Sequence, residues 1–439
     1  MLNLKKLSSF FCILLLASSY SSVATSSEDD VIKYKKCYVT FVRKSIDQTD
    51  PLLKKVNEEK ISGVQACQEL LQAMSSEGDK LLINHQPHSL DVFRTLNSFH
   101  RSWFAQFELN IATQDFSLSD FYDVNEMAFH LTRAFFNDKV PFSSILKSKI
   151  SYQAIRKSEK EPILLYDNSL NATTERLGKI KWDRGDEVEF TPELVQFGEY
   201  VGIEKLNTQK NKLKKNEKNH YLEFYPHRPI GAGIIGTMPY ILLNSGQNQE
   251  KMDGKNKDHR RWAKSVLRDF LCLDVPLITE EQAAPFVKPK SEISFQTKAK
   301  CMQCHATLDN MAGVIRNIEI YNTTEDGFGI LSVRAAIPHK IVPGSSKYYN
   351  QSTQGRIVMN LEDQYINKKI NNIEELADWM IQNKQLYRCS LKKVFSFLTG
   401  EGNPNDSDKK QFIDQLSNEL MVEQNYKNIF MKIIGSKYF

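Results

Sequence analysis

The sequence lacks any long apolar run beyond its N-terminal region, and its charge is nearly balanced. Its 58 Lys and Arg residues against 53 Asp and Glu residues give a net charge of +5. The densest basic run, residues 210–218, alternates Lys with Asn and contains no aromatic residue that could stack on a base. A membrane-spanning mature chain and a nucleic-acid-binding protein are therefore both disfavoured.

Metal-ligating residues are also scarce, with seven Cys and nine His among 439 residues. A structural zinc site needs a second ligand pair, such as another C-x-x-C or an H-x-x-x-H, and the chain offers neither. Zinc is therefore the weaker explanation for the single cysteine pair that the chain does have.

That pair lies in the sequence Cys301-Met302-Gln303-Cys304-His305. C-x-x-C-H is the spacing at which two thiols bond covalently to the haem vinyl groups while the next residue, the histidine, binds iron. A thioredoxin-like dithiol would follow a buried strand, whereas the segment before Cys301, residues 296–300, is short and polar. The motif predicts one covalent haem c, held by Cys301, Cys304 and His305.

The N-terminus has the three-part layout of a secretory signal. Lys5 and Lys6 precede an apolar run over residues 10–17, and Ser22-Val23-Ala24 offers a cleavage site. Cys12 lies within the apolar run without the context of a lipidation site. We therefore expect residues 1–24 to be a signal peptide and the mature chain to be periplasmic or secreted in a bacterium, where C-x-x-C-H motifs receive haem.

Four cysteines remain in this oxidising compartment, and three pairings of them are possible: Cys37, Cys67, Cys272 and Cys389. Proximity along the chain favours Cys37 with Cys67, which leaves Cys272 with Cys389. Four free buried thiols are the alternative.

Apolar periodicity predicts a mainly α fold, a helical bundle-like architecture with an embedded cytochrome c-like haem segment. We expect helices from Ser62 through Met74, from Ser117 or Ser119 to Phe135, and over 261–272, 373–381, 386–398, 408–421 and 426–434. Short β-type runs at 163–166, 180–182 and 187–190 predict a small β-containing insertion.

A glycine pattern from Gly231 to Gly236 spells G-x-G-x-x-G. A dinucleotide site would need an apolar strand before the pattern and a long helix after it. Pro226 and Pro229 precede the pattern and Pro239 follows it. We expect a tight turn near the haem.

Three stretches carry a resemblance to a known family: 142–152, then 235–309 with Arg261-Trp262 and the haem motif, then 375–400 with Tyr387-x-Cys389 and Leu398-Thr399-Gly400. In this order they resemble the planctomycete-type cytochrome c-like proteins of unknown function over roughly residues 115–439. Members continue the haem motif with Met-Asp-Pro-x-Gly, where this chain has Leu308-Asp309-Asn310-Met311. The resemblance implies a haem-binding, exported redox protein and supplies no reaction.

These observations divide the chain into five expected segments. They are a signal peptide (1–24), an N-terminal helical unit (25–110), a helical segment with the β-containing insertion (111–225), the haem segment (226–370) and a C-terminal helical segment packed on it (371–439).

The sixth iron ligand separates two functions. Met359, on a loop expected to fold back over the haem, suits electron transfer with an unidentified redox partner protein. His339 is the competing ligand, and Met380 is more typical of a core residue. An open position would instead suit a peroxidase-like enzyme or a sensor, for which the acid–base candidates are His100, Glu126, His130 and Arg133. For Glu126 and His130, one turn apart, an ordinary surface contact is the alternative.

Overall fold

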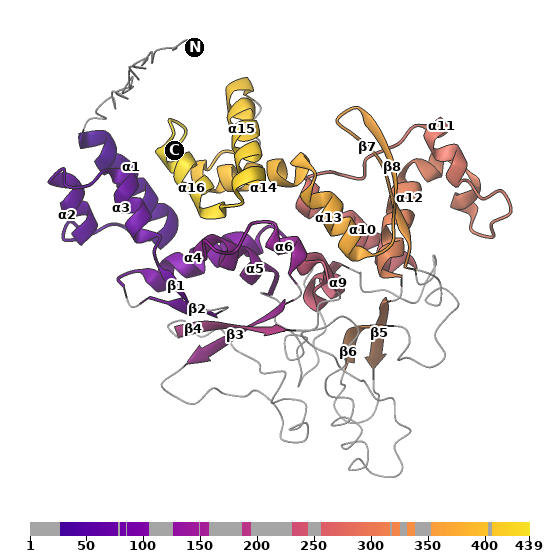
Figure 1. The fold of residues 1–439 in the computed structure, drawn as a ribbon, viewed down its shortest axis with the longest axis horizontal. Helices are drawn as coiled ribbons and strands as arrows, with labels where there is room; N and C mark the ends of the chain where they lie inside the picture. Colours follow the sequence, from indigo (N-terminus) through magenta and orange to yellow (C-terminus); the bar gives the residue numbers. More distant parts are fainter. Residues whose placement is uncertain are drawn as a thin grey trace, which may run out of the picture.

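The protein is described from a computed structural model that covers residues 27–77, 80–84, 86–104, 126–148, 150–157, 187–194, 231–244, 256–316, 318–324, 332–338, 353–402 and 406–439. The described chain is mainly helical, as predicted. Its helices form the upper part of the molecule and most of its strands lie below them (Figure 1). The expected signal peptide, the strands at 163–166 and 180–182, the basic run at 210–218 and His339 lie outside the described residues.

Four helices form the N-terminal part: α1 (Ser27–Val42), α2 (Pro51–Asn57), α3 (Gly63–Leu70) and α4 (Ser89–Arg101). The predicted cap at Ser62 is confirmed. Its hydroxyl accepts a hydrogen bond from the Gln65 backbone N–H, and the Gln65 side chain accepts one from the Ser62 N–H. This reciprocal box satisfies two amides that the first turn of a helix otherwise leaves unpaired.

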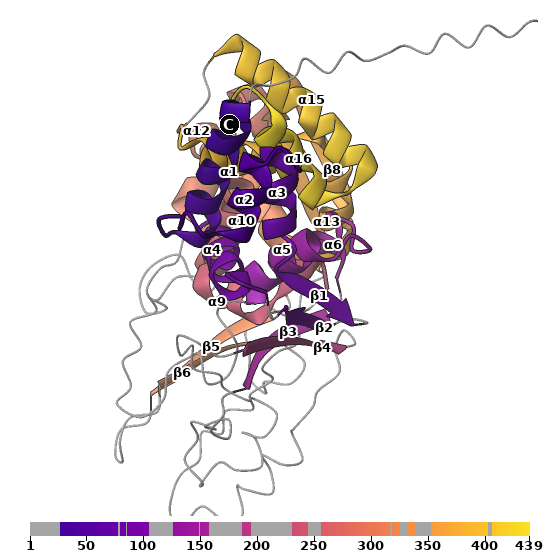
Figure 2. The same cartoon turned by 90° about the vertical axis from the view of Figure 1, so that its left-hand side faces the viewer.

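A four-stranded antiparallel sheet has the order β1-β2-β4-β3, from β1 (Met74–Glu77), β2 (Lys80–Ile83), β3 (Ile150–Lys157) and β4 (Glu187–Leu194). The sheet lies under α4 and α5 (Glu126–Phe136), and Figure 2 shows the sheet edge-on. β4 contains the predicted β-type run at 187–190. β1 and β2 were not predicted: α3 ends at Leu70, and Met74, expected to be helical, is the first residue of β1. The two strands join the N-terminal segment to the insertion through one sheet.

The glycine pattern forms the 3-10 helix η3 (Gly233–Gly236), followed by α9 (Met238–Asn244). Gly233 has a φ of +53°, and a Cβ there would lie 2.2 Å from the Ile145 carbonyl oxygen. The predicted turn is confirmed, but it packs on α6 (Ser144–Lys147) and beside Trp262 of α10 (Asn256–Leu271). Gly233 therefore allows a close backbone approach to α6, and α10 lies between the turn and the motif helix α12.

The segment with the haem motif combines helices and hairpins. α11 (Glu280–Ala283), η4 (Ala284–Phe286), η5 (Ser294–Thr297), α12 (Ala299–Ala312) and η6 (Gly313–Ile315) follow α10. Two antiparallel hairpins come next, β5 (Ile318–Thr324) with β6 (Ser332–Pro338) and β7 (Gly355–Leu361) with β8 (Gln364–Ile370). Neither hairpin was predicted.

Four C-terminal helices agree with the predicted ranges: α13 (Ile373–Ile381), α14 (Lys384–Thr399), α15 (Ser407–Glu423) and α16 (Tyr426–Gly435). Side-chain oxygens of Asn372, Asn383, Asp406 and Asn425 accept hydrogen bonds from first-turn amides. Gly400 ends α14 with a φ of +74°.

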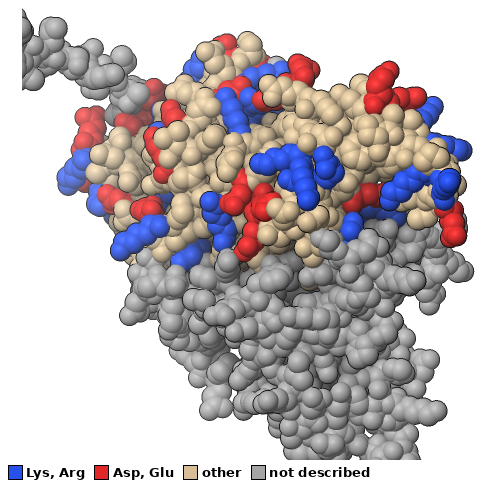
Figure 3. Space-filling view, turned by 45° about the vertical axis from the view of Figure 1, so that its right-hand side comes forward, with Lys and Arg blue, Asp and Glu red and all other residues tan. Residues whose placement is uncertain are grey.

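One large buried core contains residues from most of the described helices, from α1 to α16. α16 lies beside α3 and packs on α5, so the C-terminal helices lie against the first helices of the described chain (Figures 1 and 2). On the face shown in Figure 3, basic and acidic side chains of the described residues are interspersed. None of the described helices combines the length and the apolar character needed to cross a membrane.

Candidate functional site: the C-x-x-C-H face of α12

The three residues of the predicted haem motif lie on one face of α12. Because Cys301, Cys304 and His305 are related by i, i+3 and i+4, their side chains project from the same side of the helix. All three are partly exposed, and both thiols are free. The motif thus presents two thiols and an imidazole together on the accessible side of one helix.

The opposite side of α12 is fixed by packing. Met302 and Ala306 are buried in a small apolar cluster with Ile278, Ala283 and Val358. The Thr307 hydroxyl donates a hydrogen bond to the Val358 carbonyl oxygen at 2.5 Å. No side chain caps the start of α12; the helix packs on α10, on β7 and on α11.

The imidazole of His305 is enclosed on two sides. The Phe295 ring stacks on it with centroids 4.0 Å apart and planes 21° apart. Nδ1 of His305 lies 3.4 Å from Arg260 Nη1 and 3.6 Å from Asp309 Oδ1, and Arg260 Nε lies 3.4 Å from the same Asp309 oxygen. Asp309 comes from the next turn of α12 and Arg260 from α10.

Of these neighbours, Asp309 suits a histidine that binds iron through Nε2. An iron-bound imidazole carries its proton on Nδ1, and this N–H normally donates to a carboxylate or a carbonyl oxygen. Arg260 is only a donor, so Asp309 is the acceptor in that tautomer. Oδ1 of Asp309 is buried and makes no hydrogen bond among the described residues; its charged neighbours are Arg260 Nε at 3.4 Å and His305 Nδ1 at 3.6 Å.

A cavity of about 400 Å³ lies beside the motif helix. Its lining includes three cations, Arg260, Lys288 and Arg316, together with apolar residues such as Phe286 and Met302. More than half of its lining residues are polar or charged, including Asp309, and Cys301, Cys304 and His305 are not among them. The fit to haem c therefore rests on the donor set: two free thiols and an imidazole on one accessible face of α12.

Met359 is not on a loop, contrary to prediction. It lies in β7, opposite Ile366 of β8, and its side chain is fully buried in the main core. Its neighbour Val358 faces α12 in the small cluster, and side chains alternate along a strand. The structure therefore does not bring Met359 to His305. Met380 is buried in the main core, as predicted.

The acid–base candidates lie away from α12. His100 is in α4, where Nδ1 lies 2.9 Å from the Thr132 hydroxyl and Nε2 lies 3.4 Å from the Tyr426 hydroxyl. Glu126, His130 and Arg133 are on α5, which is buried along its whole length. The expectation of a surface contact between Glu126 and His130 was wrong, because α5 is covered by α4, α16, β3 and neighbouring elements.

The remaining four cysteines are paired as chain proximity suggested. Cys37 bonds to Cys67, with Cα atoms 5.9 Å apart, and Cys272 bonds to Cys389, with Cα atoms 5.3 Å apart. The second bond links the end of α10 to α14. Only Cys301 and Cys304 are left as free thiols among the described cysteines.

No group of three or more His, Cys, Asp and Glu side chains among the described residues is arranged to hold a metal ion. The thioredoxin-like alternative is met only in part, since Cys301 lies in the first turn of a helix but follows the 3-10 helix η5, not a strand.

Sequence reasoning missed the neighbours of His305. Asp309 had a local signal, because it follows His305 by one helical turn. Phe295 and Arg260 had none, since their approach to His305 depends on how η5 and α10 pack on α12.

Comparison with known proteins adds no further assignment: no family model, no curated protein and no solved structure matches this chain. The resemblance to planctomycete-type cytochrome c-like proteins stays a prediction.

Proposed function

We propose that this chain is an exported monohaem c-type cytochrome-like protein that exchanges electrons with a redox partner protein. The observation that carries the proposal is the placement of two free thiols and an imidazole on the accessible face of α12, while the other described cysteines are paired. Haem c, when bound, supplies a one-electron iron couple.

The chain's own residues have separate parts in this proposal. Cys301 and Cys304 hold the macrocycle through thioether bonds, and His305 binds iron through Nε2. Asp309 is the acceptor toward which the Nδ1–H points, which favours this tautomer, while the stacked Phe295 ring restricts rotation of the imidazole. The two disulfides support the periplasmic or secreted location, because disulfides persist in oxidising compartments.

The test is expression with the signal segment in a bacterium that carries a haem c maturation system. We expect one haem per chain that remains with the protein after acid–acetone extraction and gives a c-type pyridine haemochrome. The double variant Cys301→Ser/Cys304→Ser should lose covalent haem, whereas Lys300→Ala, an exposed neighbour on the same helix, should keep it. Colour that leaves with the solvent, or bound zinc in place of haem, would overturn the proposal.

A haem enzyme or sensor with an open sixth iron position is the second candidate. It is favoured by the placement of Met359 in the main core, where its sulfur packs with apolar residues. The spectrum of the loaded protein separates the two functions. A low-spin spectrum that Met359→Leu converts to high spin supports electron transfer with Met359 as ligand. A high-spin spectrum that this substitution leaves unchanged supports the open site.

A further inference from the structure

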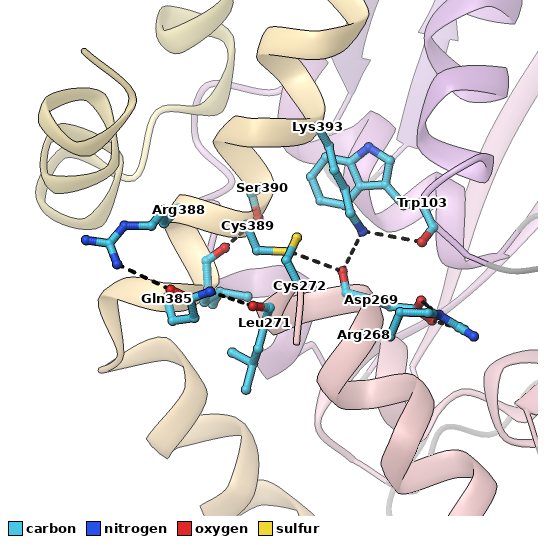
Figure 4. Close-up of a disulfide and its surroundings, with 11 residues drawn as sticks. Trp103, Arg268, Asp269, Leu271, Cys272, Gln385, Arg388, Cys389, Ser390 and Lys393 are labelled. Atoms are coloured by element: carbon cyan, nitrogen blue, oxygen red, sulfur yellow. Dashed lines mark hydrogen bonds and ion pairs between the residues drawn. A yellow bond between two sulfur atoms is a disulfide. The ribbon is translucent and has the colours of Figure 1, made fainter. Parts of the chain in front are cut away.

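In the disulfide between Cys272 and Cys389, Cys272 is exposed and Cys389 is buried. Cys272 follows the last residue of α10 and is exposed, with a φ of +52° that few non-glycine residues adopt. Cys389 lies in the middle of α14 and is only 1% exposed. Figure 4 shows the bond between the two helices. Any attacking group therefore reaches Cys272 first.

A cavity of about 600 Å³ opens beside Cys272. Its lining includes the rings of Phe99, Trp103 and Phe397, and two lysines, Lys392 and Lys393. Cys389 does not line it. The cavity is large enough for a small thiol or for a side chain of a partner protein, and its contents would face Cys272.

The Lys393 ammonium and the buried sulfur of Cys389 approach the same backbone oxygen. It follows Cys389 by four residues on α14, so both side chains are on the same face. The Lys393 ammonium donates a hydrogen bond to the Asp269 carbonyl oxygen at 2.6 Å, and Cys389 Sγ lies 3.8 Å from that same oxygen (Figure 4). The ammonium also lies 4.8 Å from the centre of the Trp103 ring.

We propose that Cys272–Cys389 is a thiol–disulfide exchange site for a dithiol reductant, with Cys272 as the attacked residue and Lys393 stabilising the thiolate that leaves from Cys389. A thiolate of the dithiol attacks Cys272 Sγ and forms a mixed disulfide. The bond to Cys389 breaks, and its electron pair goes to Cys389 Sγ. The second thiol of the dithiol then loses its proton and attacks the reductant sulfur that is bonded to Cys272. This step releases the Cys272 thiolate. The dithiol is oxidised by two electrons, and the protein disulfide is reduced.

The charge of Lys393 is present at neutral pH. Burial lowers the pKa of its ammonium to about 8, with a further lowering from Arg268 and an opposing effect from Asp269. The protonated form therefore predominates at pH 7. A positive charge beside a sulfur stabilises the thiolate and makes that sulfur the better leaving group.

The contact between the two helices does not depend on the disulfide alone. The Gln385 side chain donates a hydrogen bond to the Leu271 carbonyl oxygen at 2.6 Å, and Lys393 binds Asp269 on the same helix. Apolar residues of α10 and α14 also share the main core. The reduced protein should therefore stay folded, with the two thiols still close enough to re-form the bond.

The experiment uses the full mature chain at pH 7 with dithiothreitol, followed by alkylation and peptide mapping over time. Cys37–Cys67 is the internal control, since both of its residues are 0% exposed. We expect Cys272–Cys389 to be reduced at least about tenfold faster than Cys37–Cys67 with the far-ultraviolet circular dichroism unchanged. Equal rates, or reduction only as the helical signal is lost, would show that the bond is a structural staple.

Variants test the direction of attack and the role of Lys393. Cys389→Ser should form a mixed disulfide with oxidised glutathione at Cys272, and Cys272→Ser should react at Cys389 at least about tenfold more slowly. Lys393→Met should slow the reduction by about tenfold or more, whereas Lys392→Met, which removes a charge from the same cavity, should have little effect. Preferential reaction at Cys389, or equal effects of the two lysine variants, would overturn the proposal.

Discussion

Three buried histidines make the stability of this protein sensitive to acid. Burial lowers the pKa of His100 and of His130 to about 3, with a smaller contribution from Arg133 at His130. Burial also lowers the pKa of His259 to about 4, against a hydrogen bond with the Ile318 carbonyl oxygen that raises it. In the folded state these side chains are therefore neutral at pH 5, whereas in the unfolded chain they bind protons below about pH 6.5.

Stability should consequently fall as the pH drops from about 6.5 towards 4, because the unfolded state binds more protons in this window. Each histidine contributes about 1.4 kcal/mol per pH unit well below its unfolded pKa. The three histidines together contribute a slope to the plot of unfolding free energy against pH. We expect His100→Gln to remove about one third of that contribution. Urea unfolding between pH 6 and pH 4.5 measures this slope. The partly exposed His88 provides the control, and a His100→Gln slope equal to that of His88→Gln would contradict the prediction.

At the scale of elements, two glycines set the distance between the motif helix and its supporting hairpin. A Cβ at Gly355 would lie 2.5 Å from the Asn310 carbonyl oxygen, and one at Gly313 would lie 2.6 Å from the Gln354 carbonyl oxygen. The start of β7 therefore crosses the end of α12 with backbone against backbone. This crossing holds the side of α12 that is opposite the C-x-x-C-H face.

We expect Gly355→Ala to destabilise the protein by about 2 kcal/mol or more, because backbone atoms cannot move aside as a flexible side chain can. Denaturant unfolding of the full chain measures the loss. Gly435→Ala is the matched control, since nothing lies within 4 Å of a Cβ at that position. If both substitutions had the same effect, the crossing would not be tight.

Element predictions succeeded where the signals are local. The C-terminal helices begin at Asn or Asp caps and α14 ends at a left-handed glycine, and all of these are visible in the sequence. The hairpin of β7 and β8 was missed because its turn lacks glycine: Glu362 and Asp363 have φ values of +48° and +62°. Two-residue turns with positive φ are normally recognised by Asn-Gly or Asp-Gly.

At the scale of the whole molecule, the C-terminal helices complete the core of the N-terminal helices as well as supporting the haem segment. The rings of Phe99 and Phe397 stack with centroids 4.2 Å apart, and Phe135 lies 4.8 Å from Phe430. The Cys272–Cys389 bond adds a covalent link between α10 and α14. The C-terminal segment is therefore joined to two other parts of the chain.

We expect deletion of residues 372–439 to abolish cooperative unfolding and to expose a large apolar surface, because it removes one side of the shared core. Thermal unfolding, dye binding and size-exclusion chromatography measure these effects. Deletion of residues 436–439 alone, which removes the contact of Lys36 with Phe439, should be much milder. A soluble long truncation that unfolds cooperatively would show that the C-terminal helices are an independent unit.

The sequence alone determined the features that depend on spacing and on local caps. These are the C-x-x-C-H motif, the start of the Ser62 helix, the four C-terminal helices, and the pairing of Cys37 with Cys67 and of Cys272 with Cys389. Tertiary structure decided which side chains meet, because such contacts depend on packing between segments far apart in the chain. It placed Arg260 and Phe295 at His305, Met359 in the main core, Glu126 and His130 inside the molecule and Lys393 beside Cys389.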